Sequence, residues 1–202
     1  MARTWSVLAV VLTLSPAAAV AQHATLNVTT KNDTDLERLG KAQVERLVEE
    51  YDIGQWLFTR DVVVESRVIP HSHPVLTLST EYVRDDVRQL ATLLHEQFHW
   101  PVGDADERRE ATLAEFRALF PDAPDRSGQG ARDRYSTYLH LIVCDLEFQA
   151  MTALVGLERA RQVLASWDHY EWIYDKVLND ARIREVNRRH GWAVDSMVTR
   201  GS

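Results

Sequence analysis

The chain has 202 residues, of which 45% are hydrophobic and 26% charged, enough apolar side chains to bury one core of ordinary size. The 30 acidic and 23 basic residues give a net charge of −7, which argues against a nucleic-acid-binding protein, because such proteins carry a basic face. The single cysteine, Cys144, excludes an intramolecular disulfide and any Cys-x-x-Cys metal or redox site.

The N-terminal segment has the pattern of a secretory signal peptide. Arg3 gives it a positive start, residues 5–14 are mostly apolar, and an A-x-A cleavage site ends at Ala21. The apolar stretch is about half the ~20 residues that a membrane-spanning helix needs, which disfavours an N-terminal anchor. We therefore expect residues 1–21 to be removed and residues 22–202 to be exported, to a periplasm or the cell exterior. No later stretch reads as apolar enough to span a membrane, so we expect no anchor after cleavage.

The first part of the exported chain predicts one helix and two strands. Polar residues 22–33 read as a loose lead-in. Thr34-Asp35-Leu36-Glu37 then matches a capping box, and the helix that it starts should end before Gly54. Residues 61–65 and 75–80 are β-branched or alternating and predict two short strands. A proline-flanked turn separates the two strands, so we expect them to pair as a hairpin.

The rest of the chain is predominantly helical in pattern. From Thr80 apolar residues recur every three or four positions, and Pro101 with Gly103 should end this helix. Further helices are predicted over 106–120, 133–154, 157–166 and 168–189, with a loop over 121–132 as a candidate mobile rim. This order predicts an α+β fold, mostly α, in one domain.

The residues His95-Glu96-Gln97-Phe98-His99 form an H-E-x-x-H motif inside a predicted helix. The i, i+4 spacing places both imidazoles on one face, so two ligands of a catalytic zinc can come from one rigid element. Glu96 can reach a zinc-bound water without being a ligand and can take its proton. The alternative is a pair of surface histidines, which the apolar flanking residues disfavour.

The motif, and the strand before its helix, resemble the zincin metallopeptidases. The resemblance implies a zincin-like domain with a small β-hairpin or sheet packed on the motif helix, and one Zn²⁺ per chain. It also implies His95 and His99 as zinc ligands and Glu96 as the general base that hydrolyses a peptide or protein substrate. The class with a third histidine after the motif would need glycine and histidine where this chain has Val102 and Ala105. The resemblance is therefore to the glutamate-ligand type.

Glutamate-ligand zincins take their third ligand from a later helix, and the predicted helix over 133–154 is the donor here. Glu147 lies in an apolar stretch where an unpaired carboxylate is costly, so we predict it as the third zinc ligand. His140 shares its face and is predicted to support the ligands, with direct ligation as an alternative. Cys144 between them is predicted to be a small buried hydrophobe, and a salt bridge to an arginine is the alternative for Glu147. Met151 stands where thermolysin-like enzymes carry an aspartate, so the subfamily is not identified.

Other groups have weaker signals. His71 and His73 predict a cleft rim or a plain turn, because a second metal needs more ligands than are visible. Residues 75–80 are the candidate strand for pairing with a substrate backbone. The aromatic run His169, Tyr170 and Tyr174 offers candidates to stabilise an oxyanion, although aromatic residues at helical spacing more often belong to a core.

The sequence therefore predicts an exported zinc-dependent hydrolase, a small peptidase. One alternative is an exported non-catalytic scaffold that keeps a zincin-like fold. Another is an exported helical binding protein without a metal.

Overall fold

The computed structural model describes residues 25–125 and 129–197, so the expected signal peptide and part of the 121–132 loop lie outside the described residues. The α+β, mostly α fold is confirmed. The elements are β1 (Asn27–Thr30), α1 (Asp35–Glu50), η1 (Gly54–Trp56), β2 (Asp61–Glu65), β3 (Leu76–Ser79), α2 (Asp86–Gly103), α3 (Asp106–Leu119), α4 (Arg134–Val155), α5 (Leu157–Leu164), α6 (Glu171–Asn179), α7 (Ala181–Arg189) and η2 (Val194–Ser196).

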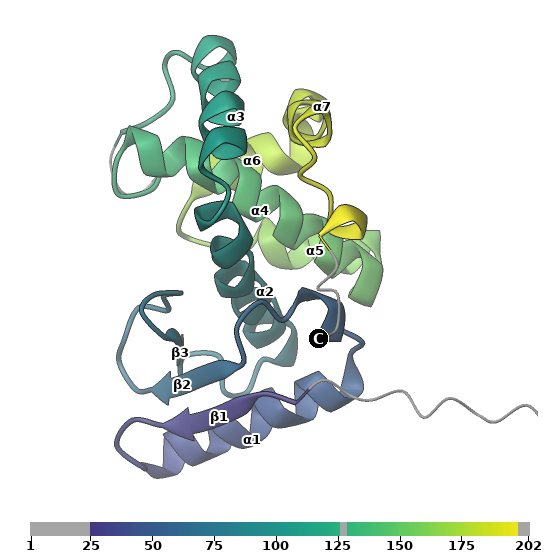
Figure 1. Ribbon diagram of the computed structural model, residues 1–202. Coiled ribbons are helices and arrows are strands. Elements are labelled where there is room, and N and C mark those ends of the chain that lie inside the picture. Colours follow the sequence, from purple (N-terminus) through teal and green to yellow (C-terminus); the bar gives the residue numbers. More distant parts are fainter. Residues whose placement is uncertain (1–24, 126–128, 198–202) are drawn as a thin grey trace, which may run out of the picture.

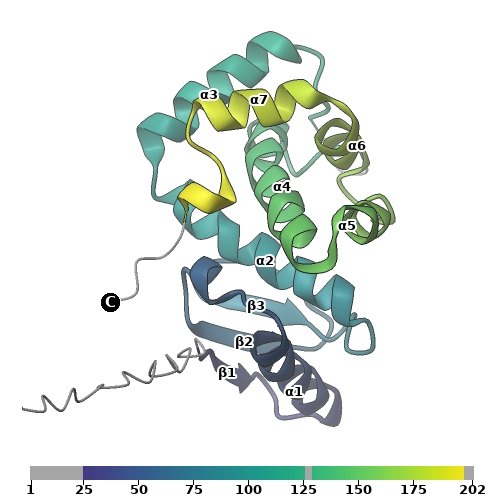
Figure 2. The same cartoon turned by 90° about the vertical axis from the view of Figure 1, so that its right-hand side faces the viewer.

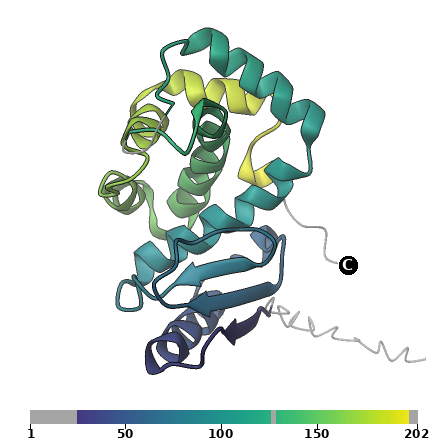
Figure 3. The same cartoon turned by 90° about the vertical axis from the view of Figure 1, so that its left-hand side faces the viewer.

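Helix α2 joins a small sheet layer to a helical layer. The sheet and α1 form the lower part in Figure 1, and α3 to α7 form the upper part, with α2 in contact with both. Figure 2 shows α4 running between the other upper helices, with α2 crossing below it. Figure 3 shows the sheet from the other side, beneath α2. The motif helix is thus held between two packed surfaces, which fixes the direction of its side chains.

The sheet is parallel, in the order β1-β2-β3. The expected hairpin between β2 and β3 is wrong, because the connection over residues 66–75 is long enough to run back along the sheet before β3 begins. On that return His71 forms an antiparallel bridge with Thr77, with N···O distances of 3.1 and 2.8 Å. Strand β1 lies in the segment expected to be a loose lead-in, although three of its four residues are β-branched.

The capping box at the start of α1 is confirmed, and it does more than cap a helix. The Glu37 carboxylate accepts hydrogen bonds from the backbone N–H of Asn32 (2.9 Å), Thr34 (3.1 Å) and Ser66 (3.0 Å), and from the Asn32 amide (3.2 Å). Burial alone would raise the pKa of Glu37, but these donors outweigh it and lower the pKa to about 2. One carboxylate thereby ties together the ends of β1 and β2 and the first turn of α1.

Helix α2 starts later than expected and ends at Gly103, as expected. The helix begins at Asp86, where the Asp85 side chain accepts from the Arg88 N–H, and residues 80–84 form turns instead. It continues through Pro101 to Gly103, because a proline near the end of a helix removes a single N–H and leaves the last turn able to close. The Asp104 N–H closes that turn on the Trp100 carbonyl at 3.0 Å.

Helix α4 is the core helix of the upper layer. It packs against α2, α3, α5, α6 and α7, and most of its residues are buried. By length and composition it is apolar enough to cross a membrane, so the expectation that no later stretch would be is wrong on that criterion. Its burial inside the described part of the fold accounts for its apolar sequence.

Two glycines and one aspartate mark helix boundaries in the C-terminal part. Gly156 (φ 83°) ends α4, and Gly191 (φ 76°) follows the end of α7, as the sequence predicts. The single helix expected over 168–189 is instead α6 and α7, because the Asp180 side chain accepts from the Arg182 N–H and starts a new helix.

Candidate metal centre

The two motif histidines project from the buried face of α2 towards α4. His95 is 8% exposed, and the apolar residues beside it in the helix are fully buried. The Nε2 atoms of His95 and His99 lie 3.3 Å apart. The i, i+4 spacing therefore brings the two imidazoles together as predicted.

His140 from α4 completes a group of three imidazoles. Each of His95, His99 and His140 offers a ring nitrogen that lies within 4.8 Å of the nitrogens of the other two. The Nδ1 of His140 is 2.7 Å from the Ser136 carbonyl oxygen, which can only accept, so Nδ1 carries the proton and Nε2 keeps its lone pair. A free Nε2 is what a metal-binding histidine needs.

Glu147 lies on the opposite edge of the His95 ring. Its Oε2 is 2.9 Å from His95 Nδ1 and accepts a hydrogen bond from the Tyr174 hydroxyl at 2.9 Å. Within the described residues, the group of potential ligands that contains Glu147 also contains His95 and Cys144, but not His99. The structure thus brings the predicted Glu147 to the site without placing it in one group with both motif histidines.

The three histidines fit a zinc ion. Two nitrogens bound at about 2.0–2.1 Å to a tetrahedral ion lie about 3.3–3.4 Å apart, and the His95–His99 separation matches this value. Burial lowers the pKa of His95 to about 4 and of His140 to about 3, and it lowers the pKa of His99 as well, so all three rings are neutral near pH 7. Neutral imidazole is the form that binds a metal.

The two buried carboxyls beside the histidines also fit a cation. Burial raises the pKa of Glu147 to about 8, and burial together with the charge of Glu147 raises that of Glu96 to about 8. In the described part of the chain no lysine or arginine pairs with either carboxyl, and Oε1 of Glu147 is buried without a hydrogen-bond partner. A divalent cation would supply the missing positive charge.

Cys144 fits the role of a buried hydrophobe. It is fully buried, and burial raises the pKa of its thiol well above the ordinary value. Its Sγ lies 4.0 Å from His95 Nδ1, on the side that Glu147 occupies.

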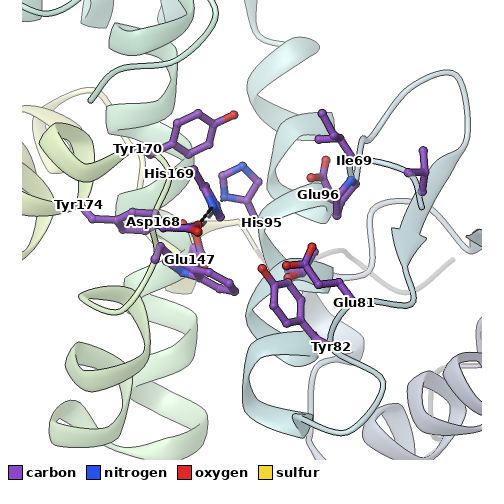
Figure 4. A pocket seen from close by; sticks show the side chains of 14 residues that line it. Ile69, Glu81, Tyr82, His95, Glu96, Glu147, Asp168, His169, Tyr170 and Tyr174 are labelled. Atoms are coloured by element: carbon purple, nitrogen blue, oxygen red, sulfur yellow. Dashed lines mark hydrogen bonds and ion pairs between the residues drawn. The ribbon is translucent and has the colours of Figure 1, made fainter. Parts of the chain in front are cut away.

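A cavity of about 320 Å³ opens beside His95, and Figure 4 shows its lining. His95, Glu96 and Glu147 line it, whereas His99 and His140 do not, so the predicted general base shares this space with one of the three histidines. The rest of the wall comes from segments without a motif, among them Ile69, Glu81, Tyr82, Trp167 and Asp168. No sequence signal marks these residues, because a cavity wall is assembled from loops that only the tertiary fold brings together.

The aromatic residues near α6 contact two different members of the site. The Tyr174 hydroxyl is bonded to Glu147, whereas the Tyr170 ring lies over His140, with ring centroids 4.5 Å apart. Tyr170 has φ 56°, a left-handed conformation that is uncommon for a residue with a side chain. Tyr170 and His169 line the cavity, so both stay candidates to face a substrate carbonyl.

The proline-flanked turn forms the neighbouring rim. His73 stacks on Trp100, with ring centroids 4.3 Å apart, and His71 pairs with β3. Among the described residues neither histidine belongs to a group able to hold a metal. The backbone N–H and carbonyl of Thr77 in β3 are already hydrogen-bonded to His71. The segment that borders the cavity is residues 68–70 rather than β3 itself.

Comparison with known proteins returns no relative: no family model, no curated protein and no solved structure matches the chain. The functional proposal rests on the site geometry and on the resemblance of the H-E-x-x-H motif.

Proposed function

We propose that the protein is an exported zinc-dependent hydrolase, a small peptidase, in which His95, His99 and His140 hold one zinc ion and Glu96 is the general base. The observation that carries this proposal is the convergence of three imidazoles, one of which, His95, lines the same cavity as Glu96. Three protein ligands with an open fourth position are typical of catalytic rather than structural zinc.

The geometry favours His140 over Glu147 as the third ligand. His140 offers a nitrogen to the group that contains both motif histidines, whereas Glu147 contacts the far nitrogen of His95. A carboxylate on the non-ligating nitrogen of a metal-binding histidine is a frequent arrangement, which fixes the tautomer and orients the ring. Glu147 would thus serve as a positioning residue, and the Tyr174 hydroxyl would hold it in place.

A zinc ion held by these histidines would polarise a substrate carbonyl and lower the pKa of a water molecule towards ~7. The chain's own residues do the rest. Glu96 takes a proton from the attacking water and passes it to the leaving amine. Glu147 keeps the His95 proton on Nδ1, so that Nε2 stays free for the metal.

The cavity borders suit an extended peptide. Residues 68–70 form one border, and the Ile69 side chain there is 85% exposed. An extended chain can lie along such a rim and hydrogen-bond to its backbone, which would carry a scissile bond past Glu96.

Elemental analysis of the purified protein, combined with a broad peptide library, tests the proposal. One zinc per chain with peptide cleavage supports it. Zinc without cleavage of any library member would instead favour a non-catalytic scaffold, and no bound metal would favour a binding protein of another kind.

A further inference from the structure

The cavity beside the candidate metal centre is acidic. Its lining includes four carboxyl side chains, those of Glu81, Glu96, Glu147 and Asp168. Among the described residues that form the wall there is no lysine and no arginine. Glu96 and Glu147 are buried and belong to the metal centre, but Glu81 and Asp168 are exposed at the mouth and have no role in the chemistry proposed above.

An aromatic pair adjoins these two exposed carboxylates. The rings of Tyr82 and Trp167 meet edge to face, with centroids 5.3 Å apart, and both residues line the cavity. The indole N–H of Trp167 is buried and has no hydrogen-bond partner among the described residues. The guanidinium of Arg88 lies 5.6 Å and 5.1 Å from the two ring centroids, which shows that this pair already accommodates one cation.

The two exposed carboxylates reach the cavity from different elements. Figure 4 shows Glu81 next to Tyr82 on one side, and Asp168 next to His169 on the other. Burial raises the pKa of Tyr82 to about 12; the negative charges of Glu81 and Asp168 add to this shift, and the positive charge of Arg88 opposes it. A ligand group placed against Tyr82 would therefore feel both carboxylates as well as the Arg88 guanidinium.

We propose that this cavity selects a positively charged substrate residue, with Glu81 and Asp168 as specificity-determining residues and the Tyr82–Trp167 pair as the wall that the cationic group packs against. The proposal rests on the hydrolase function and names its substrate class. The cationic group is the side chain of a lysine or arginine, or the free amino terminus of a peptide. The unpartnered Trp167 N–H would meet a backbone carbonyl of the same substrate.

The expected preference is moderate because both carboxylates are exposed to solvent. An exposed ion pair corresponds to about a two- to fivefold change in binding, and two such pairs with an aromatic face give about a tenfold preference for lysine over a neutral residue. The preference should shrink as salt is added, since exposed charges are screened over about 10 Å at 0.1 M ionic strength.

Cleavage of matched peptides tests the proposal. In peptides that differ at one position beside the scissile bond, kcat/KM should fall in the order lysine, glutamine, glutamate. Glu81→Gln and Asp168→Asn should each lower the lysine-to-glutamine ratio about two- to fivefold at unchanged zinc content. Glu107→Gln removes one charge from an exposed site on α3, outside the cavity lining, and should leave the ratio as it is. A ratio near one in the unmodified protein would overturn the proposal.

A binding measurement separates this proposal from the hydrolase function. Quenching of tryptophan fluorescence by Nα-acetyl-lysinamide is compared with quenching by Nα-acetyl-norleucinamide, its uncharged counterpart. Tighter binding of the lysine compound, weakened in Glu81→Gln, supports the cation site even if no peptide is cleaved. Equal binding of the two compounds overturns it, whether or not the protein hydrolyses peptides.

Acetylation of the peptide amino terminus shows whether the site binds the lysine side chain or the terminal amino group. Peptides with an internal lysine are compared with and without N-terminal acetylation. Loss of the preference on acetylation assigns the site to the free amino terminus, and its retention assigns the site to the side chain. Both results support a cation site, whereas a preference that follows neither group contradicts it.

Discussion

At the scale of single residues, Glu96 separates catalysis from scaffold. It lines the same cavity as His95 but offers no atom to the group of three histidines, so the change Glu96→Gln should leave zinc content and folding unaltered. Turnover should fall by at least about 10²–10⁴-fold, because the proton acceptor is lost. The measurement is peptide cleavage at equal zinc content, with Glu107→Gln as the control. Full turnover of Glu96→Gln would refute its role as base.

Variants of His140 and Glu147 test which residue is the third zinc ligand. His140→Ala should lose zinc, because two protein ligands hold a catalytic ion poorly. Glu147→Gln should keep zinc with an affinity lowered about 10- to 100-fold, the usual cost of losing the carboxylate behind a metal-binding histidine. Competition with a chromogenic chelator measures both affinities, and Cys144→Ala is the control that should keep zinc. Zinc lost from Glu147→Gln but kept by His140→Ala would restore Glu147 as the ligand.

Sequence spacing could not separate these two residues. They lie seven positions apart, which returns to nearly the same direction around a helix and differs by about 10 Å along its axis. Which of the two lies opposite the motif histidines depends on the position along α4 at which α2 crosses it, and no local sequence pattern encodes this position. The i, i+4 pair of His95 and His99 was readable because both ligands lie within one turn of one helix.

At the scale of elements, Glu37 joins α1 to the sheet. Glu37→Gln removes an acceptor that serves several backbone N–H groups, so the variant should melt a few degrees lower at pH 7. Because the folded pKa of about 2 is below the model-peptide value of 4.5, the stabilisation is complete above pH 4.5 and is lost as the pH falls towards 2.

Thermal melts at several pH values measure this difference. The melting temperatures of the unmodified protein and of Glu37→Gln should converge between pH 4.5 and 2. Glu49→Gln, which removes one charge from an exposed position of the same helix, should melt like the unmodified protein throughout. A constant difference between Glu37→Gln and the unmodified protein across this range would contradict the assignment.

Local signals predicted most helices, while the sheet depended on long-range contacts. The capping box of α1 and the glycines after α4 and α7 act within a few residues, and the structure confirms them. The parallel pairing of β2 with β3 depends instead on the path of residues 66–75, and β1 is held in the sheet by its pairing with β2. The β-branched pattern thus predicted β2 and β3 themselves, but not their pairing, which is a property of distant partners.

At the scale of the whole molecule, the first measurable expectation concerns export. The A-x-A site behind a short apolar stretch predicts cleavage after Ala21, so the exported chain should begin at Gln22. Intact-mass spectrometry of exported material checks this. Exported material that still carries Met1 would show that the leader stays attached.

Removal of the metal should loosen the whole molecule, because the proposed ligands connect α2 to α4, the two helices at the junction of its layers. Binding to the folded state alone adds about 3–4 kcal/mol when free zinc exceeds its Kd by 100- to 1,000-fold. For a chain of this length that corresponds to a rise in Tm of about 5–15 °C. Chelation should therefore lower Tm by this amount, and added zinc should restore it.

His140→Ala, which lacks one ligand, should respond little to either treatment. A Tm that stays constant while zinc is stripped from the unmodified protein would mean that the ion does not join these helices.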